Sequence, residues 1–451
     1  MDRPFRPCHP LALAWLLGAA AMACSEPEVG EPAPEEAAEP RAERSTAGSG
    51  DDTGGDDTGT GDAPPENARD DADGAEPAAA AAVPEETTRA LEALGYLPTA
   101  PTDNPEDRGV TVHEPSAWEG LNLYSSRHRA SAILMGMDGR EVHRWEAEDA
   151  EGSDRSWMHV EPLPTGEILA ITKDRDLAKH AWDSSLVWRR RIPAHHDLAI
   201  ADDGRLYVLI RARRTFRHRG DELPVIGDGV AVLSADGRPQ RTVWLLPLLR
   251  DEVSRTRLAR LRARLEESPA SEVVRPGGVA DLLHTNSIAI LHRDIEGVAP
   301  AGSFLLSLRS ASRIVILDAD LDEVLWTWGA GELQAQHDAT QLPNGHLMIF
   351  DNGTRREQSR VLELDAAREE IVWTYTDPAL FTRLRGGAQR LPNDHVLVTE
   401  ADSGHAFEVT RDGTLVWELW NPDVRPRRRG ESERAILYRL NRFPRSFFAP
   451  L

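Results

Sequence analysis

The sequence predicts an all-β protein whose folded part is a six-bladed β-propeller, and three repeated features predict it. Short strands separated by turns fill the chain from Asn122 almost to its end. Strands that follow an acidic residue and a turn end in tryptophan six times, at Trp145, Trp188, Trp244, Trp326, Trp373 and Trp417. The intervals are 43, 56, 82, 47 and 44 residues, and four of these five suit a four-stranded blade. A β-sandwich fits less well, because sandwiches do not repeat a block at this period.

The third feature is a block that begins with histidine. His337 begins HDATQLPNGHLMIF and His196 begins HDLAIADDGRLYVL, each with a glycine eight residues after the histidine. Related blocks begin near His159, His284 and Gly387. Each block is typical of a strand, a turn and a second strand. Because the innermost strands of a radial repeat line one channel, we expect histidines in the same register to meet at one mouth of that channel.

The N-terminal end has the pattern of an export signal. Arg3 and Arg6 precede the apolar run LALAWLLGAAAMA, which predicts a signal peptide over residues 1–23. The run is too short for a transmembrane helix. Ala-Met-Ala-Cys resembles a bacterial lipobox, so Cys24 is expected to be the lipidated first residue of a periplasmic or cell-surface lipoprotein. Ordinary cleavage near Ala23 is the alternative.

Residues 24–86 are predicted to form a disordered acidic tether. Residues 25–86 hold 19 acidic residues and three arginines, which is −16 of the formal net charge of −23. Such a segment cannot bury enough apolar surface to fold. The acidity and the export signal argue against nucleic acid as a partner. The only other cysteine, Cys8, lies in the predicted signal, so we expect no disulfide in the mature protein.

The folded part is expected to begin with a helix and a lead-in over 87–118, followed by the propeller over 119–451. Residues 121–145 supply only the second half of a blade. Closure is therefore expected to pair them with strands from the C-terminal region, which removes an exposed sheet edge. The long third interval contains PLLRDEVSRTRLARLRARLEE, whose leucine spacing predicts a helical insertion at about 247–270. The tryptophans are expected to pack between blades.

Arginines complete the candidate site. Arg309 follows the second strand of the His284 block, and Arg127 holds the same place in another block. An arginine beside imidazoles makes a site for a tetrahedral anion, because its planar fork matches paired oxygens. The set suits sulfuryl or phosphoryl transfer better than hydride or acyl chemistry. Zinc on three imidazoles is the weaker alternative, since Arg309 would repel a cation. The other alternative is that these histidines are ordinary hydrogen-bonded strand residues with no chemical role.

Four segments together resemble the bacterial aryl-sulfate sulfotransferases: HTNSIAIL, SLRSASRIVILD, QHDATQLPNGHLMIFDNG and GGAQRLPNDHVLV. The resemblance covers roughly residues 120–450 and implies an exported six-bladed propeller that moves a sulfuryl group between phenols, with no cofactor. It implies that His337 is the nucleophile. It also implies that His196, His284 and Arg309 hold the sulfuryl oxygens and assist the leaving phenol, with His195 as a rival for His196.

The chain departs from that family in two ways that bear on substrate and assembly. Residues 25–118 show no counterpart of the family's N-terminal β domain, and the chain cannot form the disulfide of the better-studied members. The predicted function is nevertheless transfer from an aryl sulfate to a phenol through a sulfohistidine. The alternative is a non-catalytic propeller lipoprotein, acting as an envelope scaffold or a ligand-binding module.

Overall fold

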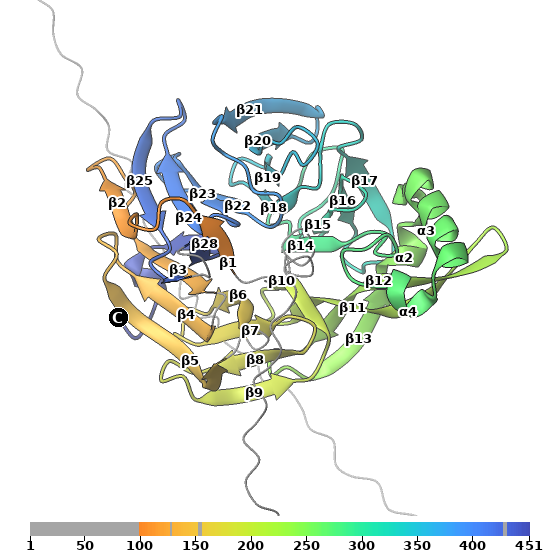
Figure 1. Ribbon diagram of the computed structural model, residues 1–451, viewed down its shortest axis with the longest axis horizontal. Coiled ribbons are helices and arrows are strands. Elements are labelled where there is room, and N and C mark those ends of the chain that lie inside the picture. Colours follow the sequence, from red (N-terminus) through yellow and green to blue (C-terminus); the bar gives the residue numbers. More distant parts are fainter. Residues whose placement is uncertain (1–98, 127–128, 152–155, 427–430) are drawn as a thin grey trace, which may run out of the picture. The chain divides into compact units, whose positions relative to one another are not determined.

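A computed structural model describes residues 99–126, 129–151, 156–426 and 431–451. The described chain is mostly β-strand, arranged in antiparallel sheets (Figure 1). The prediction of an all-β protein built from four-stranded antiparallel sheets is therefore confirmed. The predicted signal peptide, Cys24, the acidic tether and residues 87–98, where the predicted helix begins, lie outside the described residues, as does Arg127.

Six sheets of four or five strands follow one another in the described chain. Four of them are formed by consecutive strands: β6–β9 (Trp157–Pro162, Ile168–Thr172, Asp176–His180, Leu186–Arg190), β10–β13 (Ala194–Ile200, Leu206–His218, Asp221–Leu233, Pro239–Trp244), β14–β17 (Thr285–Ile290, Phe304–Leu308, Arg313–Leu317, Val324–Trp328) and β18–β21 (His337–Gln341, Leu347–Asp351, Arg360–Asp365, Glu370–Thr376). In each, the first strand contacts the first strand of the next sheet. Strands β10, β14 and β18 therefore lie side by side.

The two remaining sheets join the ends of the folded part. One is β3–β5 (Leu121–Ser126, Arg129–Met135, Glu141–Glu151) with β28 (Leu437–Phe443) against β3. The other is β22–β25 (Gly387–Arg390, Val396–Glu400, His405–Val409, Leu415–Trp420) with β2 (Gly109–His113) against β25. Strand β28 contacts both β22 and β6, so the innermost strands close a ring. Closure by the C-terminal region was predicted, but here three N-terminal strands meet one C-terminal strand.

Residues 99–118 also differ from the predicted lead-in, because they contain two strands. Strand β2 alternates Val110 and Val112 with polar residues and covers the open edge of β25. Strand β1 (Thr99–Thr102) joins β27 (Ser432–Ala435) and β26 (Val424–Pro426) in a three-stranded sheet. Both strands are short and pair with partners about 300 residues away, which no local pattern signals.

The six marker tryptophans lie in the last consecutive strand of their sheets, β5, β9, β13, β17, β21 and β25. Four indoles donate a hydrogen bond to the next sheet around the ring. The acceptors of Trp145, Trp326, Trp373 and Trp417 are Gly166 O, Glu369 Oε1, Arg411 O and Met137 O. These four tryptophans are thus packing residues between sheets, as the sequence predicted.

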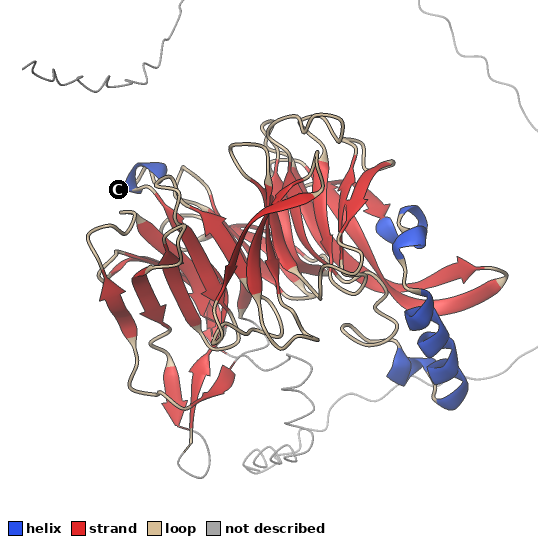
Figure 2. Ribbon diagram, turned by 90° about the horizontal axis from the view of Figure 1, so that it is seen from above, coloured by secondary structure: helices blue, strands red, loops and turns tan. Residues whose placement is uncertain are grey.

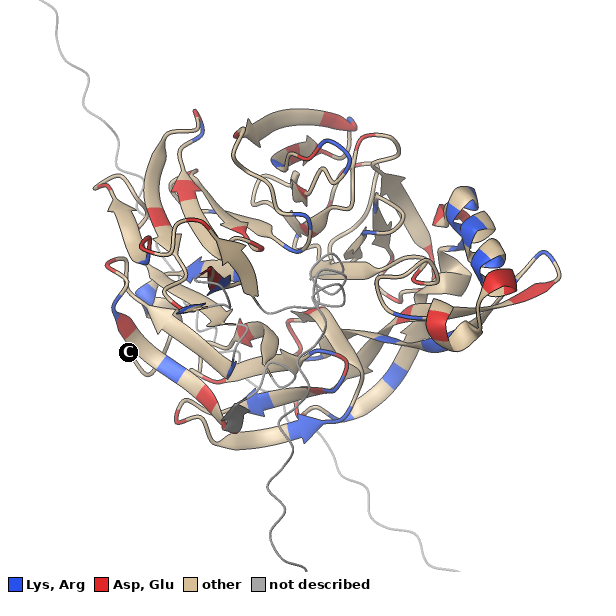
Figure 3. Cartoon of the chain, in the orientation of Figure 1, with Lys and Arg blue, Asp and Glu red and all other residues tan. Residues whose placement is uncertain are grey.

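Short helices interrupt the chain between β13 and β14: α2 (Leu245–Leu248), a 3-10 turn (Arg250–Glu252), α3 (Arg255–Glu267) and α4 (Ala270–Val273). A second 3-10 turn, Arg445–Phe447, follows β28. Helix α3 begins after Ser254, whose side chain accepts from Arg257 N, and buries Leu258 and Leu261. The helices lie beside β11–β13 at the periphery (Figure 1 and Figure 2), and basic residues recur along α3 (Figure 3). None of the described helices has the length and apolar character needed to cross a membrane.

Candidate active site

Three neighbouring innermost strands bring their histidines together. His196 lies in β10, His284 immediately precedes β14, and His337 begins β18. Pairing with the second strand is irregular at the histidine end of all three. His196 and His284 have φ of 57° and 50°, a region that side chains other than glycine seldom adopt. Bulges and left-handed residues re-aim side chains at functional sites, and here they bring imidazoles together.

The imidazoles form one cluster. Nε2 of His196 lies 3.2 Å from Nε2 of His284, and the ring centres of His196 and His337 are 6.4 Å apart. The adjacent His195 instead turns towards a carboxyl, with Nε2 3.7 Å from Asp228 Oδ1. His196 is therefore the member of that pair that joins the cluster. The structure brings together the three histidines that the sequence placed in register.

Asn352 fixes the tautomer of His337. Its Nδ2 donates to two carbonyls, those of Thr382 (2.9 Å) and Arg385 (2.7 Å), so its Oδ1 must face the imidazole. Nδ1 of His337 lies 2.7 Å from that oxygen and therefore carries the proton. Nε2 keeps the lone pair, towards which the Arg385 N–H points at 3.3 Å. Burial and the charge of Arg309 hold the pKa of His337 well below its usual 6.5, so the ring is neutral and nucleophilic.

Arg309 is a partly buried cation without a carboxylate partner among the described residues. Its backbone N–H donates to His284 O at 3.1 Å, which ties it to the cluster. Its Nε is buried with no hydrogen-bond partner in the described part of the chain. Burial lowers its pKa, as do the charges of Arg257 and Arg383, against the opposing effect of Asp281. A guanidinium held in this way beside imidazoles is prepared for a tetrahedral anion.

Carboxyl groups lie behind His284. Nδ1 of His284 is 2.6 Å from Asp281 Oδ2, which also accepts from Gly277 N at 2.6 Å. Burial would raise the pKa of Asp281, but the charge and hydrogen bond of His284 hold it below its usual range. Burial and the negative charge of Asp281 raise the pKa of the neighbouring Asp228 to about 8. Asp281 is therefore the carboxylate of this pair, and Asp228 is the protonated acid near neutral pH.

Sequence reasoning missed four groups of this site. Asp281 stands three residues before His284, and Asn352 stands in the quoted FDNG segment, so spacing offered a signal for both. Tyr438, whose Oη lies 2.9 Å from His196 Nδ1, comes from β28, which no histidine block marks. The Arg385 N–H is a backbone group and has no sequence signal.

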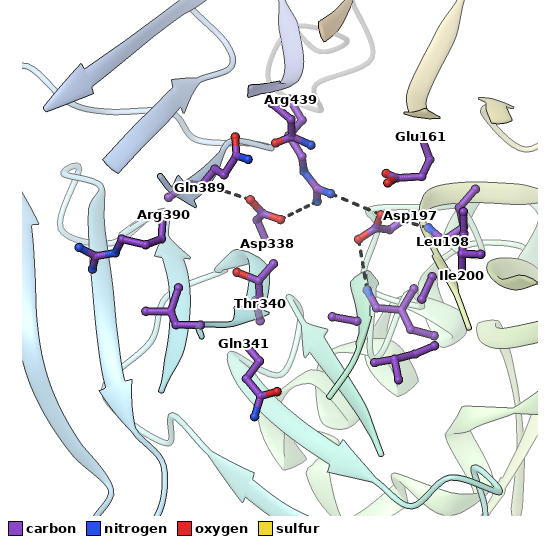
Figure 4. A pocket seen from close by; sticks show the side chains of 18 of the residues that line it. Glu161, Asp197, Leu198, Ile200, Asp338, Thr340, Gln341, Gln389, Arg390 and Arg439 are labelled. Atoms are coloured by element: carbon purple, nitrogen blue, oxygen red, sulfur yellow. Dashed lines mark hydrogen bonds and ion pairs between the residues drawn. The ribbon is translucent and has the colours of Figure 1, made fainter. Parts of the chain in front are cut away.

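One residue further along β10, β18 and β28, charged side chains pair with one another. Arg439 NH1 lies 3.4 Å from Asp197 Oδ1, and Arg439 NH2 lies 2.9 Å from Asp338 Oδ1 (Figure 4). His159 joins these charges rather than the cluster, with Nε2 3.4 Å from Asp197 Oδ1. A Cβ on Gly387 would collide with the Asp338 carboxylate, so only glycine fits there. We call Asp197, Asp338 and Arg439 the charged plug.

Beyond the plug lies a cavity of about 450 Å³, lined by residues of all six innermost strands. The walls mix apolar side chains such as Ile200 and Phe443 with polar ones such as Gln341 and Gln389, and Glu161 is the acidic residue of the lining outside the plug. The three histidines do not line this cavity. In the described part of the chain, no group of His, Cys, Asp and Glu side chains is arranged to hold a metal ion.

Comparisons with known proteins give one family. Two family profiles, both described as Arylsulfotransferase (ASST), match residues 110–334 and 261–422, so together they span the strands that carry the cluster. No curated protein matches the chain.

Solved structures resemble the chain only distantly. A protein of unknown function from Bacteroides caccae is 12% identical with a TM-score of 0.45, over 67% of this chain and 94% of that one. A streptogramin B lyase is 12% identical with a TM-score of 0.41, over 76% and 97%. The Dos1 propeller is 10% identical with a TM-score of 0.39, over 68% and 76%.

Proposed function

Because the chain belongs to the Arylsulfotransferase (ASST) family, we propose that it transfers a sulfuryl group from an aryl sulfate to a phenol through a sulfohistidine at His337. The observation that carries this proposal is a neutral imidazole nitrogen, engaged in the described chain only by a long hydrogen bond from the Arg385 N–H at 3.3 Å, close to a guanidinium that lacks a counter-ion there. Nε2 of His337 keeps its lone pair, and the guanidinium of Arg309 has no carboxylate partner among the described residues. A nucleophile near a guanidinium without a counter-ion suits an anionic electrophile such as a sulfate ester.

The reaction runs in two displacements. Nε2 of His337 attacks the sulfur, the N–S bond forms, and the S–O bond to the aryl group breaks with its electron pair on the phenolic oxygen. That oxygen takes a proton from the His196–His284 pair. An acceptor phenol then returns a proton to the pair and attacks the sulfur, which frees His337. Two displacements replace one harder one, and Arg309 offsets charge on the sulfuryl oxygens.

The fold supports the same proposal at the level of architecture. We infer that the six sheets are six blades of one propeller, with β28 closing the ring between β22 and β6. Three neighbouring blades then supply His196, His284 and His337 at one mouth of the channel. An experimental structure with another number of sheets around the channel would contradict this inference.

The activity is tested with 4-nitrophenyl sulfate and phenol. We expect nitrophenol release that phenol accelerates, and a mass gain of one sulfuryl group on the protein when phenol is left out. A protein inert towards a panel of aryl sulfates would contradict the proposal and favour the non-catalytic lipoprotein instead.

We also propose that the chain is exported and anchored through Cys24, on the strength of the basic head, apolar run and Ala-Met-Ala-Cys of its N-terminal end. An acyl anchor and the acidic tether would hold the propeller near a membrane surface. Replacing Cys24 with serine should move the protein from the membrane fraction to the soluble fraction. Unchanged fractionation would contradict the anchor.

A further inference from the structure

The contact between His196 and His284 holds a single proton. Their Nε2 atoms face each other at 3.2 Å, and two N–H groups cannot point at one another across that distance. Nδ1 of His284 must carry a proton, because it lies 2.6 Å from a carboxylate oxygen of Asp281, which only accepts. The protonation of the cluster is therefore decided by which of the two facing nitrogens holds the shared proton.

The partners of the two rings differ in charge. His284 has the Asp281 carboxylate, whereas Nδ1 of His196 has the neutral hydroxyl of Tyr438 at 2.9 Å. Burial raises the pKa of Tyr438, so this phenol stays protonated near neutral pH. A carboxylate stabilises an imidazolium, and a hydroxyl does so far less.

The electrostatic surroundings also favour a proton on His284 over a proton on His196. Burial lowers the pKa of both rings, but Asp281 raises that of His284. The charge of His284 lowers that of His196 still further. A positive charge on the pair therefore resides on His284.

We propose that His284 is the group that protonates the departing phenol and deprotonates the acceptor, with Asp281 and Tyr438 as its positioning residues. Asp281 favours the charged form of His284. Tyr438 keeps His196 neutral and turned towards it, since its hydroxyl can donate to Nδ1 or accept from it as the shared proton moves. This inference rests on the proposed sulfuryl transfer.

Atoms and electrons balance in both directions. As the bond from His337 Nε2 to sulfur forms, the S–O ester bond breaks and its electron pair stays on oxygen. The proton on Nε2 of His284 passes to that oxygen and leaves His284 neutral against Asp281. In the second displacement the acceptor hydroxyl gives its proton to the same nitrogen and its oxygen bonds to sulfur, while the bond from sulfur to His337 Nε2 breaks and its electron pair returns to that nitrogen.

Two donors that differ only in the leaving group test the assignment. Phenyl sulfate expels a strongly basic phenolate that needs a proton, whereas 4-nitrophenyl sulfate expels a weakly basic one. For His284→Gln and Asp281→Asn we expect phenol release from phenyl sulfate to fall by about 100-fold or more, the usual contribution of a general acid. Release from 4-nitrophenyl sulfate should fall far less. Tyr438→Phe should show a smaller loss with the same selectivity.

Equal losses with both donors would overturn the inference. So would a selective loss in His196→Gln without one in His284→Gln. Failure of the proposed function has a different signature, because the wild-type protein itself would then neither release nitrophenol nor gain mass. The matched control is Tyr375→Phe, a buried tyrosine in the outer strand β21, which should change neither rate.

Imidazole NMR gives a readout that does not depend on activity. We expect a strongly deshielded Nδ1–H for His284 that Asp281→Asn abolishes and Tyr438→Phe retains. Tyr438→Phe should also shift the tautomer of His196, because Nδ1 loses its partner. Unchanged His196 signals in Tyr438→Phe would remove the role assigned to Tyr438.

Discussion

Two partly buried arginines belong to neighbouring regions of the molecule, the charged plug and the histidine cluster, and they differ in what surrounds them. Arg439, in the charged plug, pairs with Asp197 and Asp338 at 3.4 and 2.9 Å. Arg309, at the histidine end, has no carboxylate within ion-pair distance among the described residues. A buried charge without a partner is costly, so Arg309 is retained for an anion that binds from outside. Arg439 already has its anions and serves the structure.

The plug and the cluster are also neighbours in sequence. Asp197 follows His196, Asp338 follows His337, and Arg439 follows Tyr438. The carboxylates are further fixed by backbone N–H groups, since Ile288 N donates to Asp197 and Ala388 N donates to Asp338. The paired charges therefore hold the backbone that aims the reactive side chains. The comparison predicts that replacing Arg309 lowers activity and that replacing Arg439 lowers stability.

Removal of the unpaired arginine should give the largest effect on activity. For Arg309→Met we expect nitrophenol release to fall by about 100- to 1,000-fold, the usual cost of losing one charge-stabilising group. Its free energy of unfolding should not fall by more than about 1 kcal/mol, because no native ion pair is lost. The rate of nitrophenol release by Arg309→Lys should lie between those of the wild-type protein and Arg309→Met, since lysine keeps the charge but lacks the planar fork of the guanidinium. Wild-type turnover in Arg309→Met would contradict the anion site.

Removal of the paired arginine should act on stability instead. Arg439→Met leaves two buried carboxylates without their cation, so the free energy of unfolding in urea should fall by about 3–5 kcal/mol. The matched control is Arg264→Ala, which breaks an exposed pair with Glu267 and should cost at most about 1 kcal/mol. If both substitutions cost the same, the plug is not the structural element described here.

The pH dependence of sulfation sharpens the contrast. Burial and Arg309 hold the pKa of His337 well below 6.5, so sulfation by 4-nitrophenyl sulfate should stay level as pH falls from about 8 to about 6. In Arg309→Met, removal of the positive charge should raise that pKa and move the onset of the decline towards higher pH.

The lowered pKa of His337 also makes the free energy of unfolding depend on pH. Below about 6.5 the unfolded chain binds a proton at His337 that the folded chain does not, so this group lowers the free energy of unfolding as pH falls. A sulfation rate that drops in the wild-type protein like that of an ordinary imidazole would contradict the neutral nucleophile.

Repetition made part of this molecule predictable. Trp145, Trp326 and Trp417 mark last strands because each sheet needs the same packing residue against the next. Strand β28 closes the ring by pairing with β3, more than 300 residues earlier, and carries neither a marker tryptophan nor a histidine block. Such pairing depends on tertiary structure rather than on local pattern.

The candidate site also has a part that the repeats predict and a part that they do not. Registration predicted that His196, His284 and His337 would meet. The left-handed backbone that turns His196 and His284 inward depends on the local geometry of irregular strands. Tyr438 and the Arg385 N–H come from segments outside the histidine blocks, so the partners that set the protonation of the cluster could not be predicted from the repeats.

The central claim is that His337 carries the sulfuryl group. The most direct test is intact-mass analysis and peptide mapping after incubation with 4-nitrophenyl sulfate in the absence of an acceptor. The wild-type protein should gain one sulfuryl group on the peptide that contains His337. His337→Asn should gain none, with its free energy of unfolding within about 1–2 kcal/mol of the wild-type value. Sulfation of the His337→Asn protein, or of a different peptide in the wild-type protein, would contradict the account.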